Sequence, residues 1–175
     1  MTIGDGNTQV YYCKFDDQDE LLACGYGDGM TRIYDTNSGK LAYTLADMKT
    51  TSSMPITCLQ WRPTSSSLKT SNIIVTASAD GTLTHWHATS GKMLHQIQPD
   101  PENHIYTMDF SKDGTLLAVA GRDLHVHIYD ETTKQLAFTM KEGPQECGHS
   151  NRIFCCKFNK ENPNMVVSGG WDNTV

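Results

Sequence analysis

Four aspartates stand in near-identical settings along this 175-residue chain, and their spacing constrains the fold more than any other feature. The four are Asp28, Asp80, Asp123 and Asp172. Successive members are 52, 43 and 49 residues apart. Six residues after each of the first three stands an aromatic residue, in the order Tyr34, Trp86 and Tyr129. Agreement at this many positions predicts a chain built from one repeated unit.

The repeated unit is predicted to consist of four short strands. In the third repeat we expect them at residues 105–110, 116–121, 125–129 and 136–140. Short apolar or alternating runs separated by turn residues are typical of antiparallel strands. A period of about 40 to 50 residues made of such strands is typical of β-propeller blades. The predicted fold class is therefore all-β, with blades of four antiparallel strands.

We expect one partial propeller over residues 1–175, in an open ring of about 3.5 blades. The expected blades cover residues 8–47, 54–99, 103–142 and 148–175, the last of them truncated. Because a blade buries its faces on its neighbours, an open ring exposes apolar faces. We therefore expect either a fragment or shortened form of a longer propeller, or a ring that another chain completes.

Composition excludes several classes of function. The net charge is −6 without a cluster of lysine or arginine, so direct nucleic-acid binding is not expected. No apolar stretch approaches 18 residues and no secretory signal is visible, so no membrane association is expected. Four of the six cysteines fall in the same repeated strand, which indicates small core residues in a reducing compartment. The expected location is the cytoplasm, or cytoplasm and nucleus.

Several short motifs identify the chain as similar to the WD-repeat β-propeller family over nearly its whole length. In that family a blade opens after a Gly-His pair, and its third strand ends in Trp-Asp. The matching pairs here are Gly148-His149 at an opening and Tyr34-Asp35, Trp86-His87 and Tyr129-Asp130 at the closings, with changes from the family pattern in each closing pair.

The resemblance also implies a buried hydrogen-bond relay of His, Ser or Thr, Asp and Trp. Its members would be Thr76, Asp80 and Trp86 in the second repeat, and His149, Ser168 and Asp172 in the fourth. The first and third repeats carry Cys24 and Val119 at the hydroxyl position. We therefore expect no relay there, and blades that unfold more readily.

Members of the family mostly bind partners on one face of the ring, around its channel. The resemblance places residues just before the turn aspartates and just before the first strands on that face. Those with strong interface side chains are Arg122, Trp171, His104 and Arg152. The loops 64–72 and 141–149 differ between repeats and are expected to set specificity.

The expected function is a non-enzymatic scaffold or adaptor that binds protein or peptide partners within a larger complex. The alternative is a constitutive structural subunit of a ciliary, cytoskeletal or ribonucleoprotein assembly. No residues form a catalytic constellation, and no cofactor or metal is expected. The pairs His85/His87 and His125/His127 lack the third and fourth ligands that zinc requires.

Overall fold

The computed structural model describes residues 3–4, 6–46, 54–64, 71–98, 102–140 and 148–175. All regular elements within these ranges are strands. The described residues thus contain no helix long and apolar enough to cross a membrane. The first sheet contains β1 (Val10–Phe15), β2 (Leu21–Tyr26), β3 (Thr31–Asp35) and β4 (Leu41–Leu45). The second contains β5 (Ile56–Trp61), β6 (Ile73–Ser78), β7 (Leu83–His87) and β8 (Lys92–Ile97). The third contains β9 (Ile105–Phe110), β10 (Leu116–Gly121), β11 (Val126–Asp130) and β12 (Gln135–Met140). A two-stranded sheet of β13 (Ile153–Phe158) and β14 (Val166–Gly170) follows.

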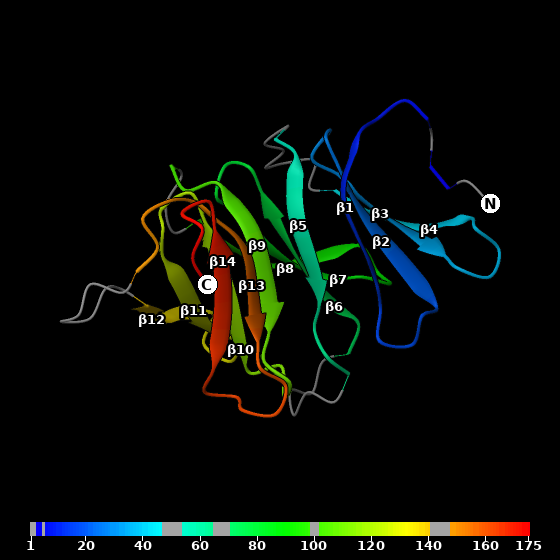
Figure 1. Cartoon of the computed structure of the whole chain (residues 1–175). Helices are drawn as coiled ribbons and strands as arrows, with labels where there is room; N and C mark the ends of the chain where they lie inside the picture. Colours follow the sequence, from blue (N-terminus) through cyan, green and yellow to red (C-terminus); the bar gives the residue numbers. More distant parts are fainter. Residues whose placement is uncertain (1–2, 5, 47–53, 65–70, 99–101, 141–147) are drawn as a thin grey trace.

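Strands follow chain order within each sheet, and every neighbouring pair is antiparallel. The first strands β1, β5, β9 and β13 lie side by side, whereas β4, β8 and β12 form the outer edges (Figure 1). The prediction of an all-β open ring of propeller blades is confirmed. The third strand of the third blade begins at Val126 rather than His125, one residue later than expected.

Apolar side chains are buried mainly between sheets. Between the first two sheets, Ile33 packs with Leu59 and Trp61, and all three are at least nine-tenths buried. The Trp61 indole N–H donates to the Lys14 carbonyl oxygen at 3.1 Å, so its polar atom is satisfied as well. Full burial of each such side chain stabilises the fold by about 1.5–3 kcal/mol. The contacts between blades therefore contribute much of the stability.

Turns repeat as closely as the strands do. The residue eleven positions after the turn aspartate has a φ of 66° at Gly39, 67° at Gly91 and 61° at Lys134. A positive φ suits glycine and is uncommon for lysine. The third repeat therefore keeps the backbone of its hairpin even where the glycine is replaced.

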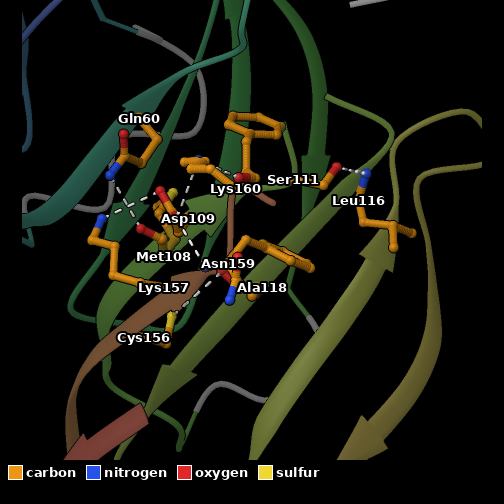
Figure 2. A network of polar contacts seen from close by, with 12 residues as sticks. Gln60, Met108, Asp109, Ser111, Leu116, Ala118, Cys156, Lys157, Asn159 and Lys160 are labelled. Carbon is orange, nitrogen blue, oxygen red and sulfur yellow. Dashed lines mark hydrogen bonds and ion pairs between the residues drawn. The ribbon is translucent and has the colours of Figure 1, made fainter. Parts of the chain in front are cut away.

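A polar network joins the inner strands of the second, third and fourth sheets (Figure 2). The buried Asp109 carboxylate accepts hydrogen bonds from the Phe158 backbone N–H at 3.0 Å and the Lys157 Nζ at 3.2 Å. Gln60 Nε2 donates to the Met108 carbonyl oxygen at 3.2 Å. Since a buried carboxylate without partners is costly, these bonds favour one alignment of neighbouring blades.

Of the five described cysteines, Cys24, Cys58 and Cys156 are buried, and the other two are exposed. Cys58 and Cys156 are buried between sheets, and burial is the main cause that raises their thiol pKa values to about 11 and about 12. Cys13 and Cys155 are exposed, so the prediction of core residues is wrong for both. They lie in the first strands of the first and fourth sheets, β1 and β13, where no other described sheet covers them. The five described cysteines are all free thiols, and Cys147 lies outside the described residues.

Candidate functional site

The same backbone hydrogen bond joins the two sets of residues predicted for one face of the ring. In each repeat, the N–H of the residue before the turn aspartate donates to the carbonyl oxygen of the residue before the first strand. These bonds are Gly27 to Gln9 and Ala79 to Pro55, both at 2.9 Å, and Arg122 to His104 and Trp171 to Arg152, both at 3.0 Å. The structure thus brings the predicted residues together in pairs, while their role in binding stays a prediction.

A β-bulge occurs at the start of the first strand in every sheet. The pairing of first and second strands skips one residue each time, and the skipped residues are Tyr11, Thr57, Tyr106 and Phe154. A bulge leaves its extra residue outside the ladder and redirects the side chain. These four residues therefore differ in orientation from the strictly alternating residues that follow them.

Two of the bulge residues form an aromatic stack with Trp171. The Tyr106 and Phe154 ring centroids lie 4.7 Å apart with planes 16° apart, and those of Phe154 and Trp171 lie 4.7 Å apart at 39°. Phe154 is 39% exposed and Trp171 is 65% exposed. We call Tyr106, Phe154 and Trp171 the rim stack. It bridges the third and fourth sheets and presents aromatic surface to solvent.

Of the three residues in the rim stack, the sequence predicts Trp171 as a partner-face residue but does not predict Tyr106 or Phe154. An aromatic residue does stand second in three of the four first strands, and this repetition could have drawn attention to it. The register shift that turns these residues out of the ladder could not be seen in the alternation of the sequence.

The other predicted face residues are linked to the same turns by the backbone pairs of Trp171 with Arg152 and of Arg122 with His104. Arg122 and Arg152 are exposed, and His104 is half-buried. The buried Asn103 accepts hydrogen bonds from the backbone N–H groups of Arg122 (3.0 Å) and Asp123 (3.1 Å). Asn103 therefore fixes the turn that carries Arg122, and sequence reasoning did not single it out.

In the fourth repeat the predicted relay residues lie in direct contact. His149 Nε2 lies 2.9 Å from the Ser168 Oγ, and its Nδ1 lies 2.9 Å from the Asp172 Oδ2. Asp172 also accepts bonds from the Ser150 N–H and from the N–H and hydroxyl of Thr174. Desolvation raises the pKa of Asp172, but these bonds lower it by more, so that it lies well below the usual value. The ionised carboxylate fixes the turn that carries Trp171.

In the second repeat the structure joins two of the three predicted relay residues directly. The Trp86 indole N–H donates to the Thr76 Oγ1 at 3.0 Å, and both side chains are buried. Asp80 lies in the following turn, where its Oδ1 accepts the Thr82 N–H at 3.1 Å.

In the first and third repeats the turn aspartate pairs with the residue four positions later. Asp28 Oδ2 lies 2.7 Å from the Arg32 Nη2, and Asp123 bonds to His127 Nε2. Desolvation raises the pKa of each aspartate, but the basic partner and nearby backbone N–H groups together lower it by more. A local contact between the aspartate and a basic side chain thus occupies the turn in both repeats. The lower stability expected of these blades remains a prediction.

The paired histidines have separate partners. His85 Nε2 lies 2.9 Å from the Glu131 Oε1, whereas His87 Nδ1 lies 2.8 Å from the Ser90 Oγ. Across the described ranges, no group of three or more His, Cys, Asp or Glu side chains is arranged to hold a metal ion. The loops 64–72 and 141–149, expected to set specificity, lie mostly outside the described residues.

Comparison with known proteins shows the family. The model of the anaphase-promoting complex subunit 4 WD40 domain matches residues 2–65 and 69–161. The U3 snoRNP-associated protein-like YAO of Arabidopsis thaliana is 32% identical over 100 residues, which are 47% of this chain and 19% of that protein. The mRNA export factor GLE2 of Chaetomium thermophilum is 26% identical over 154 residues, which are 83% of this chain and 41% of that protein.

The fold also matches a solved structure. A chain in "Crystal Structure of Mitotic Checkpoint Complex" superposes with a TM-score of 0.78 at 21% identity, covering 95% of this chain and 46% of its own length. The chain described here spans less than half the length of each of these relatives. The repeated strands, the relay residues and the family match together establish that this chain belongs to the WD40-repeat family of β-propellers.

Proposed function

We propose that this chain holds a protein or peptide partner on the face that carries the rim stack, and that it works by rigid display of side chains rather than by catalysis. WD40 propellers are in general non-enzymatic scaffolds for protein interaction. The proposal adds to this general role a particular surface, with Arg122, Arg152 and His104 beside the rim stack. We further propose that it acts in the cytoplasm, or in cytoplasm and nucleus, as part of a larger complex.

The exposed Trp171 ring is the observation that carries this proposal. Its side chain is 65% exposed although it stacks on Phe154 at 4.7 Å. Tryptophan, tyrosine and arginine are the residues that most often dominate interface energies. Burial of the free aromatic surface by a partner would gain about 25 cal/mol per Å².

The backbone beneath the rim stack is already fixed. The Trp171 N–H bonds to the Arg152 carbonyl oxygen, and the turn after it is fixed by the contact of Asp172 with His149. A surface that is ordered before binding loses less conformational entropy when the partner arrives. This favours direct docking of a partner onto the rim stack.

The test compares two double variants of the tagged full chain. Phe154→Ala/Trp171→Ala removes the rim stack, and Leu136→Ala/Phe138→Ala removes similar exposed apolar surface from the outer strand β12. We expect quantitative capture from cells to show partners that are lost with the first variant and kept with the second. Equal capture by both variants and the unchanged chain would refute the site. A partner that stays bound to the chain and does not exchange with free partner would favour the alternative role of a constitutive structural subunit.

A further inference from the structure

We propose that Cys13 and Cys24 form a redox-sensitive dithiol site, which hydrogen peroxide converts into a reversible disulfide. Cys13 lies in β1 and Cys24 in β2, and the two residues are partners across this antiparallel pair of strands. Both are free thiols. The site belongs to the first sheet, so it is separate from the rim stack, which bridges the third and fourth sheets.

The hydrogen-bond pattern of β1 and β2 places the two cysteines where opposite side chains approach closely. The Asp16 N–H donates to the Leu21 carbonyl oxygen at 3.0 Å, so these two residues form a hydrogen-bonded pair. Hydrogen-bonded and non-hydrogen-bonded pairs alternate along an antiparallel ladder. Cys13 and Cys24 come three steps further along the same unbroken register, and they therefore form a non-hydrogen-bonded pair.

A pair of this kind has the spacing that a disulfide needs. In non-hydrogen-bonded pairs the Cα atoms lie about 4.5 Å apart, and both side chains stand on the same face of the sheet. Cα atoms joined by a disulfide usually lie about 4.4–6.8 Å apart. The two thiols can therefore bond without a change of strand register.

The equivalent positions in the other repeats explain why Cys13 is accessible. Leu59, Met108 and Cys156 occupy the place of Cys13 in their own first strands, and each of them is fully buried. Leu59, for example, packs with Ile33 of the preceding sheet. No described sheet precedes the first one, and Cys13 is exposed. Peroxide can therefore reach this thiol, and a blade packed on the same face would protect it.

The two thiols suit a two-step oxidation. The exposed Cys13 sulfur attacks one oxygen of hydrogen peroxide, which gives a sulfenic acid and releases one water. Cys24 is only 7% exposed, and burial, with a smaller effect of Cys13, raises the pKa of its thiol to about 11. It is thus protected from direct oxidation. The Cys24 sulfur then attacks the Cys13 sulfenic acid, which forms the disulfide and releases a second water.

Cys155 provides a control within the same chain. It is exposed and free like Cys13, but its partner across the strands is Gly169, which has no thiol. Its chain neighbour Cys156 is fully buried and packs with side chains of the third sheet. A sulfenic acid on Cys155 therefore meets no thiol in the described part of its sheet. It should stay available to dimedone, a reagent that traps sulfenic acids.

The experiment treats the reduced full chain, at low concentration, with hydrogen peroxide and dimedone, and then blocks the remaining thiols. Trypsin cleaves after Lys14 and Arg32, so a disulfide between Cys13 and Cys24 joins peptides 1–14 and 15–32. We expect mass spectrometry to show this joined peptide, and dithiothreitol to separate it, because an exposed disulfide is readily reduced. Dimedone should label Cys155 at least about five-fold more than Cys13.

Two serine variants assign the reaction to this pair. Cys24→Ser introduces a hydroxyl where the second and fourth repeats carry Thr76 and Ser168, so the fold should accept it. In this variant the joined peptide should disappear, and dimedone should label Cys13 as it labels Cys155. Cys155→Ser should leave the yield of the joined peptide unchanged.

Two results with the unchanged chain would overturn the proposal. One is equal labelling of Cys13 and Cys155 by dimedone without the joined peptide, which would show that Cys24 does not reach the sulfenic acid. The other is a Cys13 thiol that stays reduced while Cys155 is oxidised, which would show that peroxide does not reach the site. Neither result depends on a variant, so both remain decisive even if a substituted chain does not fold.

Discussion

The Trp171 ring rests against the Phe154 ring, with centroids 4.7 Å apart and planes at 39°. Trp171 belongs to the turn after β14, whereas Phe154 is the bulge residue of β13 and stacks on Tyr106 of the third sheet. The exposed indole is thus supported by side chains from two blades. Both the bulge and the turn repeat throughout the chain, but only this pair of blades combines them into a stack of three aromatic rings among the described residues.

Phe154 is predicted to matter for binding about as much as Trp171. Phe154→Ala removes a contact surface and also the ring that holds the indole in place. Because the two side chains act together, the effects of Phe154→Ala and Trp171→Ala should not add in the double variant. Titration calorimetry with a captured partner measures the three affinities. Additive losses would show that the rings act separately.

Gly121 is predicted to be required for stability. A Cβ at this position would lie 2.0 Å from the His104 carbonyl oxygen, which accepts the Arg122 N–H on the proposed partner face. Gly121→Ala should therefore lower the free energy of unfolding by about 2 kcal/mol or more. Gly169→Ala is the matched control, since nothing lies within 4 Å of its added Cβ. Urea unfolding compares the two; an equal effect would contradict this steric account.

Ser168 is predicted to stabilise the fourth repeat through His149. Ser168→Ala leaves the mostly buried His149 Nε2 without its partner, which should cost about 1–2 kcal/mol of unfolding free energy. Ser150→Ala removes a hydroxyl from an exposed position nearby and should change stability by less than about 0.5 kcal/mol. If both variants unfold alike, the hydroxyl does not support the relay.

Removal of one partner of the buried pair His85–Glu131 is predicted to lower the free energy of unfolding. Replacement of both residues by apolar ones is predicted to be tolerated. At the equivalent contact between the first and second sheets the chain uses Ile33 and Ala88. His85→Ile removes one of the partners of the buried Glu131 carboxylate and should lower the free energy of unfolding by about 3 kcal/mol. His85→Ile/Glu131→Ala should recover most of this loss. Thermal unfolding of both variants measures it, and a double variant no better than the single one would contradict the prediction.

This pair also predicts how stability depends on pH. Burial lowers the pKa of His85 despite the opposing effect of Glu131, so the folded chain keeps His85 neutral. Protonation in the unfolded chain begins near its ordinary pKa of about 6.5, and the contribution to stability is present above that pH. It falls as pH drops below about 6.5. The difference in unfolding free energy between the unchanged chain and the double variant should therefore shrink from pH 7 to pH 5, and a constant difference would be contrary evidence.

The periodicity of the sequence predicts the fold. It does not predict which side chains of different repeats contact each other. The turn aspartates and the aromatics six residues later identify the blades because the same local structure recurs. The relay residues His149, Ser168 and Asp172 were found by their resemblance to a known motif. The His85–Glu131 contact joins residues 46 positions apart and has no equivalent elsewhere in the described repeats, so no pattern marks it.

The residues of the proposed partner face were only partly predictable, for a similar reason. Trp171 stood out because an aromatic in a tight turn is unusual. Phe154 lies in a strand whose apolar run is typical of core residues, and a one-residue bulge turns it outward. Whether a strand residue faces the core or solvent depends on register, which is fixed by pairing with the neighbouring strand.

Site-specific photo-crosslinking tests the central claim most directly. Benzoylphenylalanine at position 171 of the full chain, expressed in its natural cells, would lie on the proposed partner face, and the same group at position 138 would lie on the exposed outer strand β12. The account predicts a discrete protein adduct from position 171 that is absent from position 138. Adducts that are equal at both positions, or present only at position 138, would contradict it.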